Sequence, residues 1–172
     1  AILVATGAEE HRPEIYGLGT LNTVMTQTDF EAALENENNQ GTDWRHLQVV
    51  MLQCAGSRDA DHLPYCSRIC CNQAVKNARR MKALHPEARV DVLYRDMRCY
   101  GLAEIDYALA RREGINFLRY DPEENPLQIT TEEPGIEITV VDPSIRLPVR
   151  FHPDLLVLST GMKPRDAEDL AS

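Results

Sequence analysis

Between residues 47 and 120 the sequence alternates short apolar runs with amphipathic stretches, and this alternation restricts the possible folds more than any other feature. The apolar runs predict strands at Leu47–Gln53, Arg89–Tyr94 and Ile115–Tyr120. The stretches between them predict helices from Ser67 to Leu84 and from Ala103 to Arg112. Strands and helices that alternate with short connections are typical of a parallel sheet with right-handed crossovers.

The chain changes character after this unit. Leu127–Thr131, Ile136–Val141 and Leu147–Phe151 predict three short strands, and the Pro, Gly and Ser residues between them indicate an antiparallel meander. A last apolar run, Leu155–Ser159, is expected to join the parallel sheet. The sequence therefore predicts an α/β, Rossmann-like three-layer fold in which the meander covers one side of the sheet.

The N-terminal segment is mostly polar. Ile2–Ala5 is a short apolar run that predicts a buried strand, and a buried strand so close to residue 1 indicates that the chain is a piece of a longer polypeptide. Thr28 followed three residues later by Glu31 fits a capping box, which predicts a short helix over residues 28–34.

Charge and composition exclude two classes of function. The net charge of −9 and the pI near 5.0 disfavour nucleic-acid binding, which needs a basic surface. No apolar run approaches the roughly 20 residues that a bilayer requires, so no membrane insertion is expected. An odd number of cysteines, five, without a secretion signal disfavours a disulfide framework and favours a cytoplasmic location.

Four of the five cysteines lie close together, with the spacing C-x11-C-x3-C-C. Cys54 ends a predicted strand, Cys66 lies in a loop, and Cys70 and Cys71 lie on the next helix, so all four can meet at the carboxyl edge of a parallel sheet. Zinc sites mostly use C-x2-C pairs, whereas four thiolates suit a [4Fe-4S] cluster. Buried core thiols are the alternative, and a redox pair of adjacent cysteines is disfavoured by strain. Cys99 is expected to be an ordinary half-buried thiol that lies away from the other four.

Two similar segments bracket the predicted sheet. Ile2–Gly7 (ILVATG) and Leu155–Gly161 (LLVLSTG) are both apolar runs that end in Thr-Gly. This arrangement resembles the nucleotide domain of two-dinucleotide-domain flavoproteins of the disulfide-reductase class. That resemblance implies a G-x-G-x-x-G fingerprint after Val49–Gln53, but cysteines occupy its place. A degenerate NAD(P)-binding domain is therefore expected.

The segments QCAGSRD, PYCSRICC, VDVLYRDMRCYG and DLLVLSTGMKP resemble the A subunits of CoB-CoM heterodisulfide reductases and their homologues, which include the related component of quinone-interacting oxidoreductases. The likeness extends from Ile2 to Pro164. It implies an oxidoreductase subunit with a thioredoxin-reductase-like flavoprotein core, FAD and a [4Fe-4S] cluster.

The resemblance also implies roles for individual residues. It gives four cluster ligands, which are Cys54, Cys66, Cys70 and Cys71. It gives two flavin-contacting turns, formed by Thr6, Gly7, Thr160 and Gly161. Lys76 matches a lysine near the reactive edge of the isoalloxazine, although its helix position alone fits a solvated surface lysine equally well. Arg95, Asp96 and Arg98 follow a strand where nucleotides are usually read, but without the glycine fingerprint they are expected to form loop salt bridges.

The domain organisation follows from the same resemblance. Residues 1–41 are expected to be a return strand, loop and short helix of the flavin domain, residues 42–164 the degenerate nucleotide domain, and residues 165–172 a tail leading back. We expect a fragment of an iron–sulfur flavoprotein that transfers electrons and keeps FAD only in the longer polypeptide. Its expected partners are the remaining flavin domain, the other subunits of a heterodisulfide-reductase-like or quinone-interacting complex, and a second copy as a further option. The alternative is a zinc-stabilised or nucleotide-binding interaction module without catalysis.

Overall fold

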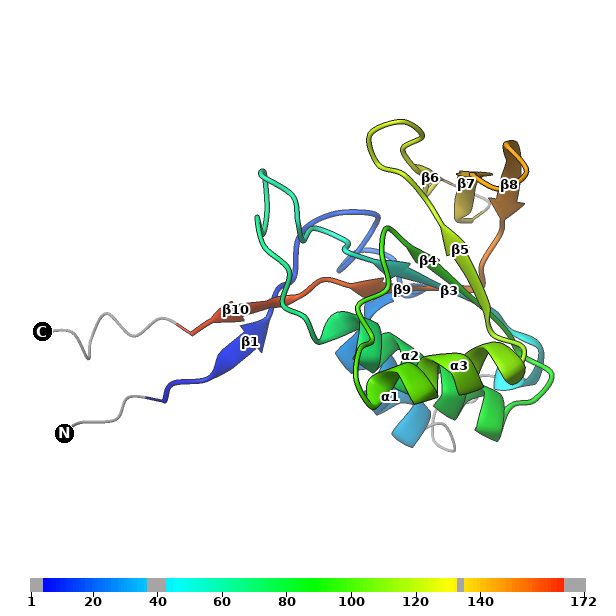
Figure 1. Ribbon diagram of the computed structural model, residues 1–172, viewed down its shortest axis with the longest axis horizontal. Helices are drawn as coiled ribbons and strands as arrows, with labels where there is room; N and C mark the ends of the chain where they lie inside the picture. Colours follow the sequence, from blue (N-terminus) through cyan, green and yellow to red (C-terminus); the bar gives the residue numbers. More distant parts are fainter. Residues whose placement is uncertain (1–4, 37–42, 133–134, 166–172) are drawn as a thin grey trace, which may run out of the picture.

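The centre of the protein is a parallel sheet of five strands (Figure 1). The structure, a computed structural model, describes residues 5–36, 43–132 and 135–165. Along the chain the strands are β2 (Val24–Thr26), β3 (Gln48–Gln53), β4 (Arg89–Tyr94), β5 (Asn116–Arg119) and β9 (Leu155–Ser159). In space they run β2–β9–β3–β4–β5, and all neighbours are parallel.

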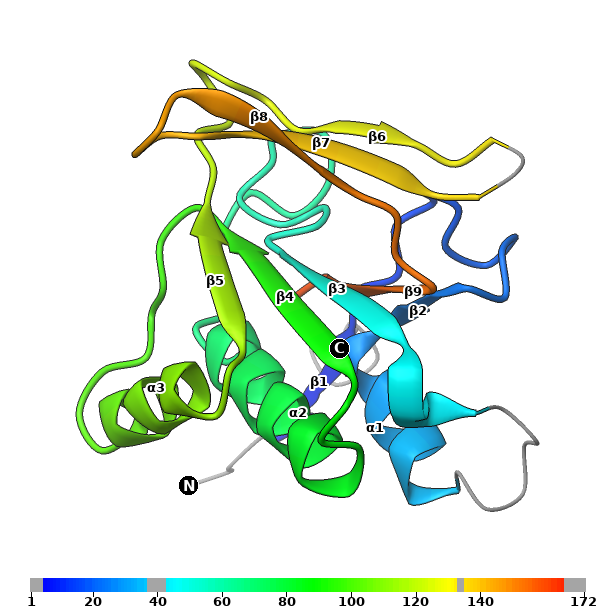
Figure 2. The same cartoon turned by 90° about the vertical axis from the view of Figure 1, so that its right-hand side faces the viewer.

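Different layers cover the two faces of this sheet (Figure 2). One face carries the helices α1 (Gln27–Glu35), α2 (Cys70–Leu84) and α3 (Ala103–Arg112). The other face carries an antiparallel meander whose strands are β6 (Gln128–Thr130), β7 (Glu137–Asp142) and β8 (Leu147–Phe151). A short 3-10 helix, Trp44–His46, leads into β3. The predicted Rossmann-like, three-layer α/β fold is confirmed.

The sheet contributes to an apolar core on each of its faces. In β3, Val49 and Met51 pack with the helix layer, whereas Val50 and Leu52 pack with the meander layer, as the two-residue period of a strand requires. All four side chains are buried, at 1% exposure or less. A strand buried on both faces has a continuous apolar sequence, which explains why β3 is recognisable from its residues alone.

The start of α1 differs from the prediction. The sequence does not predict strand β2, and the chain turns from it directly into the helix at Gln27. Thr26 is therefore the N-cap, and it shares the capping box with Asp29. The predicted capping box of Thr28 and Glu31 is wrong, because the helix begins earlier and Thr28 already lies in its first turn. The strand predicted at residues 2–5 falls mostly on residues outside the described part of the chain.

The start of α2 also differs, because the helix begins at Cys70 and not at Ser67. Two local features stop it from extending further back. Arg68 has a positive φ of 62°, which is incompatible with a right-handed helix. The Ser67 side chain is engaged with Met162 in hydrogen bonds across the molecule. The remaining predicted helix and strand ends agree with the structure to within one or two residues.

A two-stranded antiparallel ribbon projects from the layered unit, by which we mean the parallel sheet with its helix layer and its meander layer. It consists of β1 (Ala8–Glu10) and β10 (Met162–Pro164). Figure 1 shows it on the same side as the loop after β3, at the carboxyl ends of the parallel strands. The domain division at residues 41 and 164 stays a prediction. Among the described helices, none combines the length and apolar character needed to cross a membrane.

Candidate functional site

The expected site residues after β3 and after β9 are brought together by the sheet. These strands are parallel neighbours, and Gln53 lies opposite Ser159 in their register. The buried Gln53 side chain donates a 2.9 Å hydrogen bond to Ser159 Oγ, and the Ala55 N–H donates to the Ser159 carbonyl. Cys54 and Thr160, the next residues on each strand, therefore both leave the sheet at its carboxyl edge, where ligands of open α/β sheets bind.

The segment from Cys54 to Ile69, which we call the cysteine loop, has an unusual backbone. Cys54, Arg58 and Arg68 all have positive φ values between 57° and 62°. Each such non-glycine residue costs roughly 1 kcal/mol or more. The loop folds back on itself through hydrogen bonds from Arg58 N to the Tyr65 carbonyl and from Leu63 N to the Gly56 carbonyl. Strain of this kind is concentrated at functional sites, so it supports the choice of this loop.

The four thiols of the predicted cluster interact with one another. Burial raises the pKa of Cys70 to about 12, and the neighbouring Cys71, Cys54 and Cys66 contribute to that increase. Burial also raises the pKa of Cys71, and Cys54 and Cys66 add to that shift. Thiols influence each other in this way only at short range. These mutual influences, together with the position of Cys54 at the end of β3 and of Cys70 and Cys71 in the first turn of α2, indicate that the thiols face the same edge of the sheet.

Cationic and N–H donor groups surround these thiols. Burial raises the pKa of Cys54, and Arg58 and Arg95 act in the opposite direction. Arg98 lies near enough to Cys66 to interact with it, and the Arg68 N–H donates to the Cys66 sulfur at 3.4 Å. Positive charges and N–H donors next to sulfur stabilise the thiolate form. Burial still dominates, because the pKa values of Cys54, Cys70 and Cys71 are all raised, so these groups offset only part of the cost of a thiolate.

The loop salt bridges expected after β4 are present for Asp96 and Arg98, whereas Arg95 donates a 3.2 Å hydrogen bond to the Arg58 carbonyl. Asp96 pairs with Arg58 at 2.6 Å and with Arg98 at 3.3 Å. Sequence reasoning missed the second role of these arginines, which is to face the cysteines. Their position offered a signal, because the residues after β4 lie beside those after β3 when the two strands are parallel neighbours.

The chemistry of this donor set fits an iron–sulfur cluster. Such clusters are held by four thiolates and are tuned by hydrogen bonds to sulfur. The thiols gather without reaching coordination geometry, since no three His, Cys, Asp or Glu side chains in the described ranges are arranged to hold a metal ion. All five cysteines are free of disulfides. The assignment of the four as ligands stays a prediction.

Cys99 is closer to this group than the sequence indicated. The residue is buried, and burial followed by the influence of Cys71 raises its pKa to about 11. It lies in the loop between β4 and α3. The backbone of the preceding residue, Arg98, interacts with the Cys71 thiol. Cys99 is therefore a neighbour of one predicted ligand, and its role stays open to a direct test.

The Thr160–Gly161 turn has two features of a ligand-contacting turn. Thr160 is 2% exposed, and its Oγ1 is buried without a hydrogen-bond partner in the described residues. Gly161 has a φ of +88°, and a Cβ there would lie 3.0 Å from Ser67 Oγ and 3.1 Å from Leu63 Cδ2. Glycine is needed both for the backbone conformation and for close contact with the cysteine loop. An unpaired buried hydroxyl fits a turn whose partner is a bound group such as FAD.

The Thr6–Gly7 turn lies at the other end of the ribbon. Gly7 has a φ of 75° and its carbonyl accepts a hydrogen bond from Arg165, beyond the outermost pair Ala8 and Pro164. At the inner end, the His11 N–H donates to the Gly161 carbonyl at 3.0 Å. The length of the ribbon thus separates the two turns, and this unit does not bring them together.

Lys76 lies on the exposed surface of the helix layer. Its side chain is 55% exposed, and its Nζ forms a 2.6 Å ion pair with Glu31 of α1. This contact joins α1 to α2. The predicted position of Lys76 beside a flavin is not tested by these contacts and stays a prediction.

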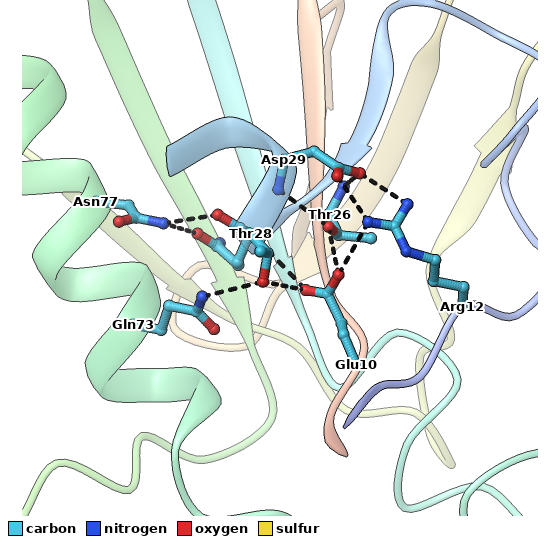
Figure 3. A network of polar contacts seen from close by, with 8 residues as sticks. Glu10, Arg12, Thr26, Thr28, Asp29, Gln73 and Asn77 are labelled. Atoms are coloured by element: carbon cyan, nitrogen blue, oxygen red, sulfur yellow. Dashed lines mark hydrogen bonds and ion pairs between the residues drawn. The ribbon is translucent and has the colours of Figure 1, made fainter. Parts of the chain in front are cut away.

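A polar network anchors strand β1 to the N-terminus of α1 (Figure 3). The Glu10 carboxylate accepts hydrogen bonds of 2.7 Å from the hydroxyls of Thr26 and Thr28. Arg12 forms a bidentate pair with Asp29 at 2.6 and 3.0 Å. Carboxylates at a helix N-terminus are stabilised by the helix dipole. Sequence reasoning missed this network, because its members are joined only by the tertiary fold.

Sequence comparison with known proteins finds relatives of one kind. The chain is 32% identical over 190 residues to the second iron–sulfur A subunit of the CoB–CoM heterodisulfide reductase of Methanopyrus kandleri, a match that covers 99% of the chain and 28% of that protein. It is 34% identical over 184 residues to the iron–sulfur A subunit of the CoB–CoM heterodisulfide reductase of Methanocaldococcus jannaschii, covering 95% of the chain and 27% of that protein. No protein-family model matches the sequence.

Comparison with solved structures supports the fold. Ornithine hydroxylase from Pseudomonas aeruginosa superposes with a TM-score of 0.58 at 12% identity, covering 96% of this chain and 47% of that one. The thioredoxin reductase of T. acidophilum superposes with a TM-score of 0.53 at 11% identity, covering 92% and 43%. At such identities the likeness concerns the fold alone.

Proposed function

The chain belongs to the family of the A subunits of CoB–CoM heterodisulfide reductases, and we propose that it is the part of an electron-transferring iron–sulfur flavoprotein that holds a [4Fe-4S] cluster close to FAD. Cys54, Cys66, Cys70 and Cys71 are the proposed ligands. The chain spans only 28% and 27% of the two relatives described above, so the activity of the whole protein is part of this proposal.

One observation carries the proposal. The four thiols of the C-x11-C-x3-C-C pattern influence one another's pKa and belong to elements that meet at the carboxyl edge of the sheet, beside the turn that ends β9. In that turn, Gly161 packs closely against the cysteine loop. The Thr160 hydroxyl has no hydrogen-bond partner among the described residues. A sulfur-rich site and a candidate flavin turn thus adjoin each other, which suits the passage of electrons between two redox groups.

The chain's own residues have separate parts in this proposal. When bound, a [4Fe-4S] cluster exchanges single electrons and FAD accepts or releases one or two. Arg58 and Arg95 oppose the increase in pKa that burial gives to Cys54. In this proposal the Thr160 hydroxyl would hydrogen-bond a flavin group, and Lys76 would stabilise negative charge on a reduced flavin if the remainder of the polypeptide brought it there.

Anaerobic reconstitution with iron and sulfide tests the proposal. The reduced chain is expected to take up iron and to develop the broad visible absorbance of a cluster. Cys66→Ser removes one ligand and should abolish this absorbance, because a cluster of this type needs all four thiolates. Cys99→Ser, the matched control, should retain it.

Other outcomes of the same experiment would contradict the proposal. Equal loss of absorbance in both variants, or in neither, would remove the assignment of the four ligands. Binding of zinc in place of iron, without visible absorbance, would favour a zinc-stabilised interaction module. Iron content is measured chemically beside the spectrum, so that uptake and cluster assembly are read separately.

The proposal extends to location and partners. The relatives are named as components of multi-subunit enzymes, among them the H2/formate:CoB-CoM heterodisulfide,ferredoxin reductase of Methanococcus maripaludis. We propose that this chain acts in the cytoplasm, inside a longer polypeptide that assembles with further subunits of a heterodisulfide-reductase-like or quinone-interacting complex. A homodimer is a further arrangement that size measurement of the assembled protein would reveal.

A further inference from the structure

The cysteine loop holds the first residue of β10 by its backbone. The Met162 N–H donates a 2.7 Å hydrogen bond to Ser67 Oγ, and the Ser67 hydroxyl lies 3.2 Å from the Met162 carbonyl, to which it donates. The Tyr65 hydroxyl donates to the same carbonyl at 3.2 Å. Tyr65 and Ser67 flank Cys66 directly. The two residues beside a proposed ligand thus hold the start of the ribbon strand.

The turn before β10 is packed on the same loop. A Cβ at Gly161 would meet Ser67 Oγ at 3.0 Å, Leu63 Cδ2 at 3.1 Å and Ser57 Cβ at 3.3 Å. These three residues all belong to the cysteine loop. The turn therefore has no room for a side chain, and its position depends on where the loop lies.

The second ribbon strand has an anchor of its own. Glu10 of β1 accepts hydrogen bonds from Thr26 and Thr28 at the start of α1. Its side chain is only 13% exposed, so the contact is shielded. Loss of the Ser67 contacts would therefore loosen β10 and the Thr160–Gly161 turn from the cysteine loop, leaving them held by Tyr65, His11 and the pairing with β1.

We propose that Ser67 is a positioning residue that fastens the Thr160–Gly161 turn to the cysteine loop, so that the two segments keep one relative position. Any movement of the Cys66 segment is then passed through Ser67 to Met162 and the turn. This proposal rests on the proposed function only for the two cofactors, a cluster at the cysteine loop and FAD at the turn. The contacts of Ser67 themselves are present in the chain without either cofactor.

Hydrogen exchange of the reduced, metal-free chain tests the direction from loop to ribbon. Ser67→Ala removes both contacts and should speed exchange of the Met162 and Lys163 amides roughly threefold to tenfold, the value of a net hydrogen bond. Exchange in β9 should stay unchanged. Ser67→Thr keeps a hydroxyl and should restore protection, and Ser144→Ala, an exposed serine in a distant turn, should have no effect.

Thiol labelling tests the direction from turn to loop. Gly161→Ala forces the turn away from the cysteine loop and should speed alkylation of Cys66 by iodoacetamide several-fold, measured by mass spectrometry. Gly19→Ala is the matched control, because Gly19 has a similar φ of +82° but no atom within 4 Å of its Cβ position. It introduces the backbone strain without the clash.

Wild-type exchange at Met162 and Lys163 in Ser67→Ala, or equal Cys66 labelling in the two glycine variants, would overturn the proposal. The proposed function fails on a different measurement, the iron content and visible absorbance of the reconstituted chain. Because exchange and labelling use the metal-free chain, either proposal can be refuted without refuting the other.

Discussion

At the scale of single residues, two buried threonine hydroxyls differ in whether they have hydrogen-bond partners. Thr26 Oγ1 donates to Glu10 and accepts from the Asp29 N–H, so it satisfies a helix end. Thr160 Oγ1 is buried without a partner in the described part of the chain. An unsatisfied buried hydroxyl lowers stability by about 1–3 kcal/mol. Such a cost at Thr160 is consistent with a residue kept for a ligand and not for the fold.

Substituting each threonine by the isosteric valine distinguishes a hydroxyl with hydrogen-bond partners from one without. Thr160→Val should raise the free energy of unfolding by about 1 kcal/mol, because it removes an unpaired polar group. Thr26→Val should lower it by about 1–2 kcal/mol, because it removes a helix cap and a hydrogen bond to a carboxylate. Urea unfolding of the metal-free chain measures both. A loss of stability in Thr160→Val would show that its hydroxyl already has a partner.

At the scale of helices and strands, the sequence predicts elements whose signal is local. β3, β4 and β9 are apolar runs, and α3 is followed by Gly114, so their predicted bounds are close to those observed. β2 has only three residues and is a strand because it pairs with β9, far along the chain. The same limit explains the misplaced start of α1, since the cap is set by where β2 ends.

The candidate site divides in the same way. The spacing of the four cysteines is visible in the sequence and requires no knowledge of the fold. The roles of Ser67 and Arg98 are not, because a serine or an arginine in a loop has no pattern that shows its distant partner. Ser67 contacts Met162, and Arg98 contacts Cys66, only after the sheet has placed their loops together.

The anchor between β1 and α1 should make stability depend on pH. The Arg12 guanidinium, through its hydrogen bonds, holds the pKa of Asp29 below its ordinary value, and the Thr26 N–H acts in the same direction. A carboxylate with a lowered pKa stabilises the fold above its unfolded-state pKa, near 3.8, and loses this contribution as pH falls through the folded value.

Asp29→Asn should therefore lower the stability at pH 7, by about 0.5–1 kcal/mol for a partly exposed pair at a helix cap, and should flatten the decline below about pH 4. Thermal unfolding between about pH 2.5 and 7 measures this dependence. Glu104→Gln, an acidic residue in the first turn of α3, is the control and should leave the decline in place. If the stability of Asp29→Asn declines in acid as steeply as that of the wild type, the Arg12–Asp29 pair does not contribute to this decline.

At the scale of the whole molecule, the layered unit offers a flavin only a partial site. Of the two Thr-Gly turns, one lies at the inner end of the ribbon, where His11 bonds Gly161, and the other lies at the outer end, where Arg165 bonds Gly7. The sequence after β3 contains cysteines where a glycine-rich pyrophosphate loop would be needed to seat a dinucleotide. In the proposed function, the unit would therefore supply contacts to FAD without the means to enclose it.

The 172-residue chain is accordingly expected to bind FAD weakly or not at all, whether or not its thiols carry a cluster. Titration followed by flavin fluorescence should show no saturation at micromolar concentrations, because most of the cofactor would stay in water. A longer polypeptide of the kind proposed, in which further segments would cover the ribbon, should bind FAD stoichiometrically, and Thr160→Val should weaken that binding by removing a hydrogen-bond donor. Stoichiometric FAD retained by the 172-residue chain through purification would contradict this division of the site, since the layered unit and its ribbon would then suffice to bury the cofactor.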